Sequence, residues 1–211
     1  MLRANSVQTE LEVQILRQLR IWPEGTPISA DALAQLGGKT KVGRALARLV
    51  AQNHLLRMTR GLYLLPVQGK FGPRAPAVQT VLQGLTRMTG EIIVTSPATA
   101  ANALGASLQV PVRHVFLTSG RTRRFYLGKL SVDLVHAPSW QLLLPGSVAG
   151  DVLRCLISGG KLAAGSEVQR LQKIVPEVEF EALRAVTAKL PKWLAAEIRN
   201  PRQSHHRSLG K

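Results

Sequence analysis

Apolar residues recur at helical intervals in two segments near the N-terminus, residues 7–20 and residues 41–52. The first segment follows Ser6, a favoured N-cap residue, and ends before Pro23, because proline is a poor helix continuer. Its inner face comprises Leu11, Ile15, Leu16 and Leu19. We therefore predict an amphipathic helix that packs against the rest of an N-terminal domain.

The second segment has two faces of different character. Its apolar face comprises Val42, Ala45, Leu46, Leu49 and Val50. Its cations, Lys41, Arg44 and Arg48, are three and four positions apart on another side. At about 100° per residue, the mean directions of the two sets differ by more than a right angle. We therefore expect one face to be buried and the other to meet an anionic partner.

A short helix is predicted before this segment and a β-hairpin after it. A short helix is predicted over residues 30–36 with Ser29 as its cap, and Thr40 is the expected N-cap of the helix that follows. Residues 55–65 then form two apolar stretches around Thr59-Arg60-Gly61, as in a β-hairpin with glycine in the turn. This order indicates a winged helix-turn-helix, with the second amphipathic segment as its recognition helix.

Composition changes after residue 66, where three prolines and two glycines fall within residues 66–76. Residues 67–76 are therefore interpreted as a linker. Beyond it, helices are expected over 77–89 and 97–104, strands over 91–95 and 112–118, a hairpin over 123–127 and 130–136, and helices over 147–158, 166–174, 179–190 and 191–199. We predict an α+β fold: a winged helix-turn-helix domain at 1–66, a mixed α/β domain at 77–200 with a small, mainly antiparallel sheet and C-terminal helices, and a flexible basic tail at 201–211.

Basic residues greatly outnumber acidic residues in this chain, which bears on the kind of partner that it binds. The 211 residues include 28 Lys and Arg against 12 Asp and Glu, a formal net charge of +16. The excess is spread over the chain, with nets of +5, +6 and +5 for residues 1–66, 67–160 and 161–211. Such a field favours polyanions. No apolar run approaches the roughly 20 residues that span a bilayer, and no signal-peptide core is present. We expect a cytoplasmic, nucleoid-associated protein without a membrane partner.

Candidate DNA contacts gather at the start of the recognition helix, on its cationic face and on the wing. They are Lys39, Thr40, Lys41, Arg44, Arg48, Arg57, Thr59 and Arg60. Arginine can clasp the O6 and N7 atoms of guanine, while lysine and the backbone N–H groups of a helix start hold phosphate. The alternative is a merely solvated helix face. The absence of acids from this face and the arginines of the wing favour DNA binding.

A second basic cluster is centred on the predicted hairpin. It comprises Arg113, Arg121, Arg123, Arg124 and Lys129. A solvated loop and a phosphate-contacting or docking surface are both compatible with it. Alternation along the strand places Phe125 and Leu127 on one face and Arg124 and Tyr126 on the other.

Catalytic and metal sites are not indicated. The histidines lack ligand spacing, phosphate-binding glycine loops are absent, and residues 67–160 contain only three acids: Glu91, Asp133 and Asp151. Cys155 is the single cysteine and lies in an apolar run, as expected for a buried, inert thiol. We therefore expect no catalysis, no metal and no cofactor.

Several motifs resemble the AbiEi-like family of abortive-infection antitoxins. The recognition helix with Arg57-x-x-Arg60-Gly61-Leu62-Tyr63 is similar to the N-terminal domain of that family. The central sequence is similar to its second domain: Ala100-Ala101-Asn102-Ala103-Leu104-Gly105, Gln109-Val110-Pro111 and Leu117-Thr118-Ser119-Gly120. The resemblance covers about residues 7–160.

This resemblance implies the antitoxin of a type IV toxin–antitoxin system. In such proteins the winged domain represses its own operon at inverted repeats in double-stranded DNA. The second domain counteracts a nucleotidyltransferase-like toxin, generally without a tight complex. Two alternatives stay open from the residues alone: a stand-alone winged-helix transcription regulator and, less favoured, a nucleic-acid-acting enzyme.

Overall fold

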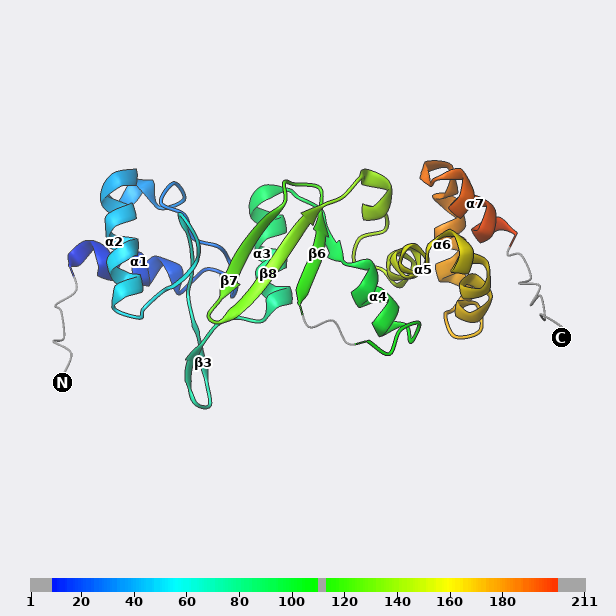
Figure 1. Cartoon of the computed structure of the whole chain (residues 1–211). Coiled ribbons are helices and arrows are strands. Elements are labelled where there is room, and N and C mark those ends of the chain that lie inside the picture. The colour runs from blue at the N-terminus through cyan, green and yellow to red at the C-terminus, as the bar shows by residue number, and fades with distance from the viewer. Residues whose placement is uncertain (1–8, 110–112, 201–211) are drawn as a thin grey trace. The chain divides into compact units, whose positions relative to one another are not determined.

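The computed structural model describes residues 9–109 and 113–200 (Figure 1). It is an α+β protein, which confirms the predicted fold class. The chain divides into two compact units. The first comprises the residues up to Glu91 together with Arg124–Val132, and the second comprises Ile92–Arg123 together with the residues from Asp133 onward.

The first unit begins with α1 (Glu10–Leu19), which is capped by Thr9. The Thr9 hydroxyl accepts a hydrogen bond from the Glu12 amide, and the Glu12 carboxylate accepts one from the Thr9 amide at 3.0 Å. This reciprocal capping box satisfies two amides that have no partner within the helix. The cap predicted at Ser6 lies outside the described residues.

The segment predicted as the recognition helix is α2 (Lys39–Ala51). Its N-cap is Gly38, not Thr40, because the chain enters the helix with a left-handed φ of +80° at that position, a conformation that favours glycine. The short helix expected before it is reduced to a 3₁₀ turn, η1 (Ala34–Leu36), while the Ser29 hydroxyl accepts from the Ala32 amide as a local cap. A segment this short gains little from helical hydrogen bonds alone.

The wing is the antiparallel pair β1 (Leu56–Thr59) and β2 (Leu62–Leu64). Gly61 takes a positive φ of +77° in its turn, as the sequence predicted. Ile28 pairs with Tyr63 through two backbone hydrogen bonds, of 2.8 and 2.9 Å, and so adds a short β-bridge before α2. The winged helix-turn-helix arrangement is therefore present. Its core includes Ile15, Leu19, Ile28, Leu33, Val42, Ala45, Leu46 and Leu49.

The segment interpreted as a linker forms a second hairpin, β3 (Val67–Gly69) and β4 (Gly72–Arg74). The helix after it, α3 (Val78–Thr89), belongs to the first unit and not to the second. A Cβ atom at Gly84 would lie 2.5 Å from the carbonyl oxygen of Gly25, so α3 packs directly on that loop. The boundary between compact units therefore falls later in the chain than the proline- and glycine-rich composition indicated.

A four-stranded sheet follows, with the strand order β5-β6-β8-β7. Its strands are β5 (Ile93–Thr95), β6 (His114–Thr118), β7 (Arg123–Leu127) and β8 (Leu130–His136). β5 pairs with β6 in the antiparallel sense. The helix α4 (Pro97–Ala103) is capped by the Ser96 hydroxyl. These elements match the predicted strands, hairpin and helix within a few residues.

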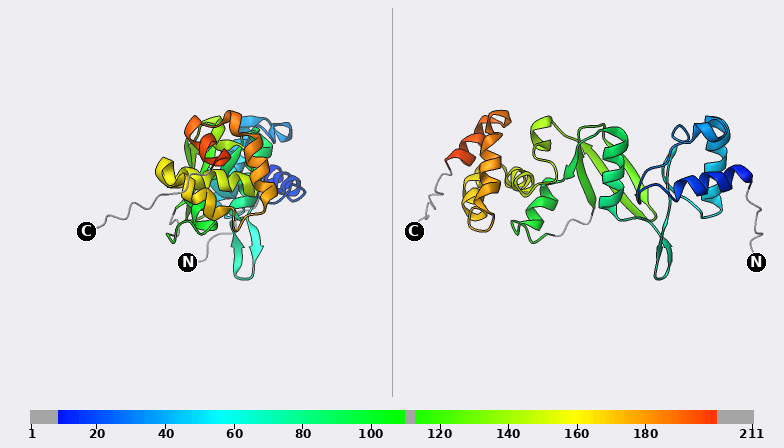
Figure 2. Two further views of the ribbon diagram at one scale, coloured as in Figure 1. Left: turned by 90° about the vertical axis from the view of Figure 1, so that its right-hand side faces the viewer. Right: turned by 180° about the vertical axis from the view of Figure 1, so that it is seen from behind.

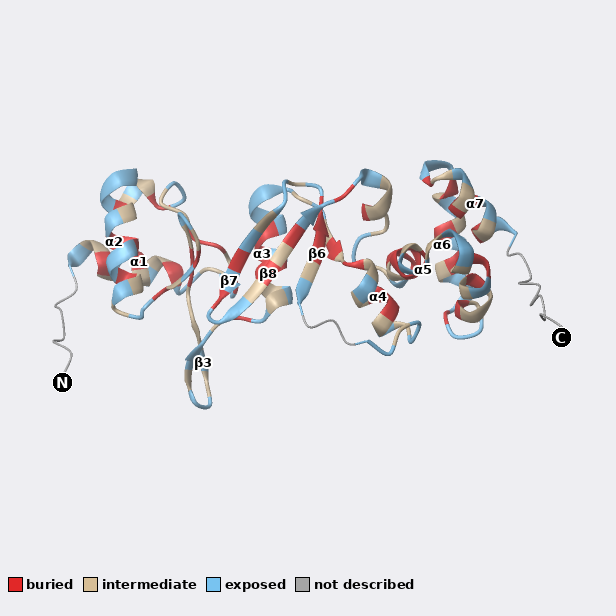
Figure 3. Cartoon of the chain, in the orientation of Figure 1, coloured by how far each residue is buried: buried red, intermediate tan, exposed pale blue. Residues whose placement is uncertain are grey.

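Helices make up the C-terminal part of the second unit (Figure 2). They are η2 (Ser139–Leu142), α5 (Val148–Leu171), α6 (Glu177–Ala185), η3 (Thr187–Lys189) and α7 (Lys192–Arg199). α5 spans the two helices predicted over 147–158 and 166–174, with a break at Gly160, where φ is +67°. Buried residues line the inner faces of α5, α6 and α7 (Figure 3).

No helix within residues 9–109 and 113–200 is both long enough and apolar enough to span a membrane. The predicted flexible tail, residues 201–211, lies outside the described residues.

Candidate nucleic-acid interface

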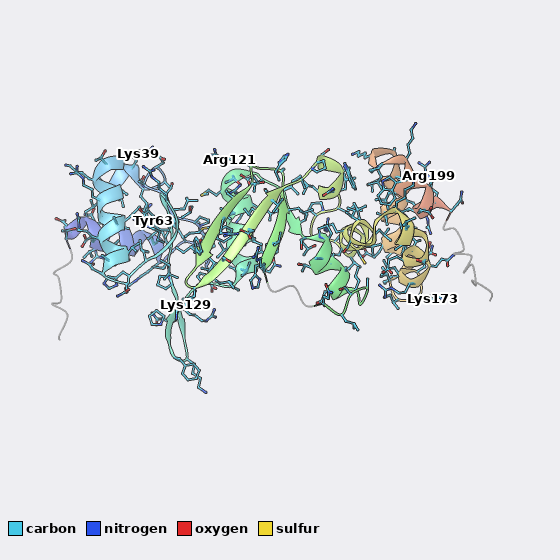
Figure 4. All side chains as sticks on the ribbon, in the orientation of Figure 1. Lys39, Tyr63, Arg121, Lys129, Lys173 and Arg199 are labelled. Atoms are coloured by element: carbon cyan, nitrogen blue, oxygen red, sulfur yellow. The ribbon has the colours of Figure 1, made fainter. Side chains whose placement is uncertain are left out.

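α2 presents the two faces that the sequence predicted. Val42, Ala45, Leu46 and Leu49 are fully buried. Lys41, Arg44 and Arg48 are exposed, as are Lys39 and Thr40 at the start of the helix. Lys39 is labelled in Figure 4. The first backbone N–H groups of any helix have no partner within it, so this end carries partial positive charge beside two lysines.

The cations on the exposed face of α2 differ in whether a salt bridge engages them. Lys39 forms a salt bridge of 2.8 Å with Asp31, and both side chains are 69% exposed. Exposed pairs of this kind contribute little and exchange readily with solvent. Within the described residues, no ion pair holds Lys41 or Arg44. These two side chains are therefore the most available cations on α2.

Arg48 is tied to α1. Its Nε donates to Oε1 of Glu12 at 2.5 Å, and Glu12 is only 1% exposed while the Arg48 side chain is half exposed. The sequence predicts Arg48 as a DNA contact and indicates no role for Glu12. Helical spacing could have predicted that Glu12 is buried. It lies three residues before Ile15 and seven before Leu19, and so falls on the buried face of α1.

The charge state of Glu12 follows from its partners. Burial raises the pKa of the carboxyl, but the hydrogen bonds from Arg48 and from the Thr9 amide outweigh it, so the net pKa lies below the ordinary value of 4.5. Glu12 is therefore ionised at neutral pH and forms a true ion pair with Arg48.

The wing carries the remaining predicted contacts. The Arg57 guanidinium carbon lies 5.9 Å from the centroid of the Tyr63 ring, directly across the β1–β2 pair. Tyr63 is buried and Arg57 is exposed, so the cation–π contact packs the guanidinium against a ring that is fixed in the core. Arg60 lies exposed in the turn and Thr59 is half-buried at the end of β1.

The sequence that contains most of these residues carries cations and no acids. Residues 32–90 contain no Asp or Glu at all. The same stretch contains Lys39, Lys41, Arg44, Arg48, Arg57, Arg60, Lys70, Arg74 and Arg87. The net positive charge of this stretch attracts a polyanion over a range set by ionic strength.

The second basic set is distributed over two ends of the sheet. Arg113 precedes β6 and Arg121 follows it, so the strand separates them. Arg123 begins β7, whereas Lys129 lies in the turn after that strand. Figure 4 shows Arg121 and Lys129 at opposite ends of the hairpin. Arg121 and Arg123 remain neighbours, since Arg123 donates to the Arg121 carbonyl oxygen at 3.2 Å.

Side-chain alternation in β7 follows the prediction. Phe125 and Leu127 are buried, whereas Arg124 is exposed and Tyr126 is 48% exposed. Successive side chains of a strand point to opposite faces, so Arg124 and Tyr126 share the exposed face of β7.

A buried polar cluster in the second unit was not singled out from the sequence. Arg154 is 1% exposed and donates to Asp151 and Thr95, each at 3.1 Å, and to the Leu143 carbonyl oxygen at 3.3 Å. The Thr95 hydroxyl in turn donates to Asp151 at 2.6 Å. Burial lowers the pKa of Arg154, and Asp151 counteracts this. The cluster ties β5 to α5 and has a structural role.

The central residues that carry the family resemblance also hold the fold together. Asn102 donates from its amide to the Ser107 carbonyl oxygen at 3.1 Å and so secures the exit from α4, where Gly105 has a φ of +69°. Ala101 is buried. The Ser119 hydroxyl accepts from the Ile92 amide at 2.9 Å. Gln109 is described, but Val110 and Pro111 lie outside the described residues.

Metal and thiol chemistry have no evident site in the described part of the chain. Residues 9–109 and 113–200 contain no group of three or more His, Cys, Asp or Glu side chains arranged to hold a metal ion. Cys155 is buried, and burial together with the nearby Glu167 carboxylate raises the pKa of its thiol to about 12. The thiol is therefore protonated at neutral pH.

The fold and this surface define an α+β protein with an N-terminal winged helix-turn-helix. A family model for the DUF6088 family, described as a family of unknown function, matches residues 14–183. The chain belongs to that family. No curated protein and no solved structure matches it.

Proposed function

We propose that this protein binds double-stranded DNA through α2 and the wing and represses transcription of its own operon. The observation that carries the proposal is the exposed face of α2, where Lys41 and Arg44 project from a helix whose opposite side is fully buried. The acid-free stretch from residue 32 to residue 90 supports it. A helix of this kind can enter the major groove of B-DNA.

We propose different roles for the individual cations. Arg44 is the candidate for a base edge, because its guanidinium can donate two parallel hydrogen bonds to guanine. Lys41 and the start of α2 are suited to phosphate. Arg48 acts mainly as a positioning residue, since its Nε is engaged by Glu12. Arg57 and Arg60 extend the contact along the wing.

We further propose that the protein is the antitoxin of a type IV toxin–antitoxin system, counteracting a nucleotidyltransferase-like toxin without a tight complex. The resemblance of the winged domain and of the central motif to AbiEi-like antitoxins supports this. The operator would contain inverted repeats, and the protein would be nucleoid-associated. We propose no catalytic role, because the acidic residues are few and scattered.

A fluorescence anisotropy titration tests DNA binding. The full chain is titrated against a labelled duplex from the region upstream of its own gene. Arg44→Ala should weaken specific binding by about 1–3 kcal/mol. Lys41→Ala should weaken binding to all duplexes alike and flatten the salt dependence. Lys173→Ala, which removes an exposed cation from the second unit, is the control and should leave the affinity unchanged. Equal affinity for operator and unrelated duplex in the unaltered protein contradicts the proposal.

Rescue from toxin expressed from an unrelated promoter tests the antitoxin role. Arg44→Ala should still rescue the cells, because protection would not depend on DNA binding. Joint replacement of Arg121, Arg123 and Arg124 by Ala should reduce rescue. The full chain is needed, because α3 packs on Gly25 and a fragment beginning at residue 70 would disrupt the first unit. A protein that represses but never rescues is a stand-alone regulator.

A further inference from the structure

The β3–β4 hairpin ends in an exposed aromatic side chain. Gly69 pairs with Gly72, so the turn consists of Lys70 and Phe71 alone. Phe71 is 98% exposed, and Figures 1 and 2 show the hairpin projecting from the first unit. A fully exposed phenylalanine gains nothing from the folded state of its own chain, because its apolar surface stays in water.

The geometry of the hairpin holds this side chain at its tip. Val67 pairs with Arg74 and Gln68 with Pro73, so the register is fixed along the whole ribbon. Gly72 completes the turn with a φ of +107°. The Lys70 ammonium lies 5.8 Å from the centroid of the Phe71 ring. The tip therefore presents an apolar ring and a cation together.

Charge indicates which partner this tip would meet. The hairpin carries Lys70 and Arg74 and lies within residues 32–90, which contain no acid. It belongs to the same compact unit as α2 and the wing. DNA binding is strengthened by each Lys or Arg that contacts a phosphate, and this acid-free stretch supplies several such cations, whereas an apolar protein groove would use none of them.

We infer that the β3–β4 hairpin is a DNA arm whose Phe71 wedges between stacked base pairs from the minor groove. This inference rests on the proposed DNA binding. β-Ribbons and arms enter grooves of DNA, and apolar wedges such as phenylalanine partly unstack base steps and kink the duplex. Lys70 would lie against the phosphates that border the narrow groove, and Arg74 would contact the backbone from the base of the arm.

DNA bending gives the test. Full-length protein is added to a duplex from the region upstream of its own gene, labelled with a fluorophore pair at its two ends, and energy transfer reports the end-to-end distance. The unaltered protein should shorten that distance. Phe71→Ala should abolish most of the change and weaken binding about tenfold to a hundredfold, as expected for loss of a stacked aromatic. Phe71→Leu, which retains an apolar wedge, should keep much of the bend.

Two controls separate this arm from the recognition helix and from general surface effects. Leu162→Ala removes another fully exposed apolar side chain, in the second unit, and should leave binding and bending unchanged. Arg44→Ala should weaken operator binding, but the duplex that it still binds at high protein concentration should be bent. The melting temperature of Phe71→Ala should equal that of the unaltered protein, because the side chain is exposed.

The outcomes are distinguishable. Absence of operator binding by the unaltered protein overturns the proposed function and this inference with it. Operator binding with the same affinity and bend in Phe71→Ala overturns the arm alone. A change in oligomeric state in Phe71→Ala, with the bend per bound protein retained, would assign Phe71 to contact between copies of the chain and would also overturn the arm.

Discussion

Arg48 on α2 and Glu12 on α1 are joined by a 2.5 Å hydrogen bond from the guanidinium Nε to the carboxylate Oε1. Glu12 is almost completely buried and is also part of the capping box that begins α1. The pair therefore links the start of α1 to α2. The orientation of α2, and therefore the direction in which the Arg44 side chain projects, depends on this contact between Glu12 and Arg48.

Loss of Arg48 should cost far more stability than loss of Arg44. Arg48→Ala leaves a buried carboxylate without its main partner and should lower the free energy of unfolding by about 1–3 kcal/mol. Arg44→Ala, four residues earlier on the exposed face, should change it by no more than about 0.5 kcal/mol. Urea unfolding of both variants measures the difference. Equal stabilities would mean that the ion pair contributes nothing.

The same pair should make stability depend on acid pH. The pKa of Glu12 is lower in the folded state than its ordinary value of 4.5, so its contribution is fully present above that value and is lost as pH falls through the folded pKa. The melting temperature of the unaltered protein should therefore fall between about pH 5 and about pH 3. Glu12→Gln should be less stable at neutral pH and should show a smaller fall. An identical slope in both proteins would assign the acid sensitivity to other carboxylates.

Two helical glycines should respond in opposite directions to alanine. A Cβ atom at Gly84 would lie 2.5 Å from the Gly25 carbonyl oxygen and 2.9 Å from Pro27, so Gly84→Ala should destabilise by about 1–3 kcal/mol or more. The nearest atom to a Cβ at Gly43 is the Ala30 methyl at 3.8 Å, an ordinary contact. Gly43→Ala should therefore stabilise by about 0.5–1 kcal/mol through helix propensity. Thermal unfolding of the two variants provides the comparison.

Cys155 should be unreactive in the native protein. Burial and Glu167 raise the pKa of its thiol to about 12, so the thiolate is scarce at about pH 8, where thiol reagents are used. A chromogenic disulfide reagent should release its product only after urea is added. Rapid reaction under native conditions would show that the helix around Cys155 opens readily.

Local sequence patterns were sufficient to predict most of the helices and strands. Apolar periodicity predicted α1, α2 and α3, and glycines at turns predicted the wing and the β7–β8 hairpin, because these signals act over a few residues. Composition was misleading at 67–76, where prolines and glycines serve the tight turn and edge of a hairpin. Proline and glycine have positional roles in strands as well as in linkers.

The candidate interface was predicted in part for the same reason. Helical spacing alone showed that Lys41, Arg44 and Arg48 share a face. It could not show that Arg48 is engaged by Glu12, because the two residues are 36 positions apart and meet only when α1 packs on α2. The dispersal of the second basic set has a similar origin, since the strands separate residues that are close in sequence.

The sequence by itself determined the α+β class, the order of helix, turn, helix and wing, and the cationic face of α2. These follow from periodicity, capping and charge, which depend on neighbours along the chain. Only the tertiary structure decided which cations are engaged, that α3 joins the first unit through Gly84, and that Lys70 and Phe71 stand at a hairpin tip. Those features depend on side chains brought together across long stretches of chain, and no local signal encodes the distance between them.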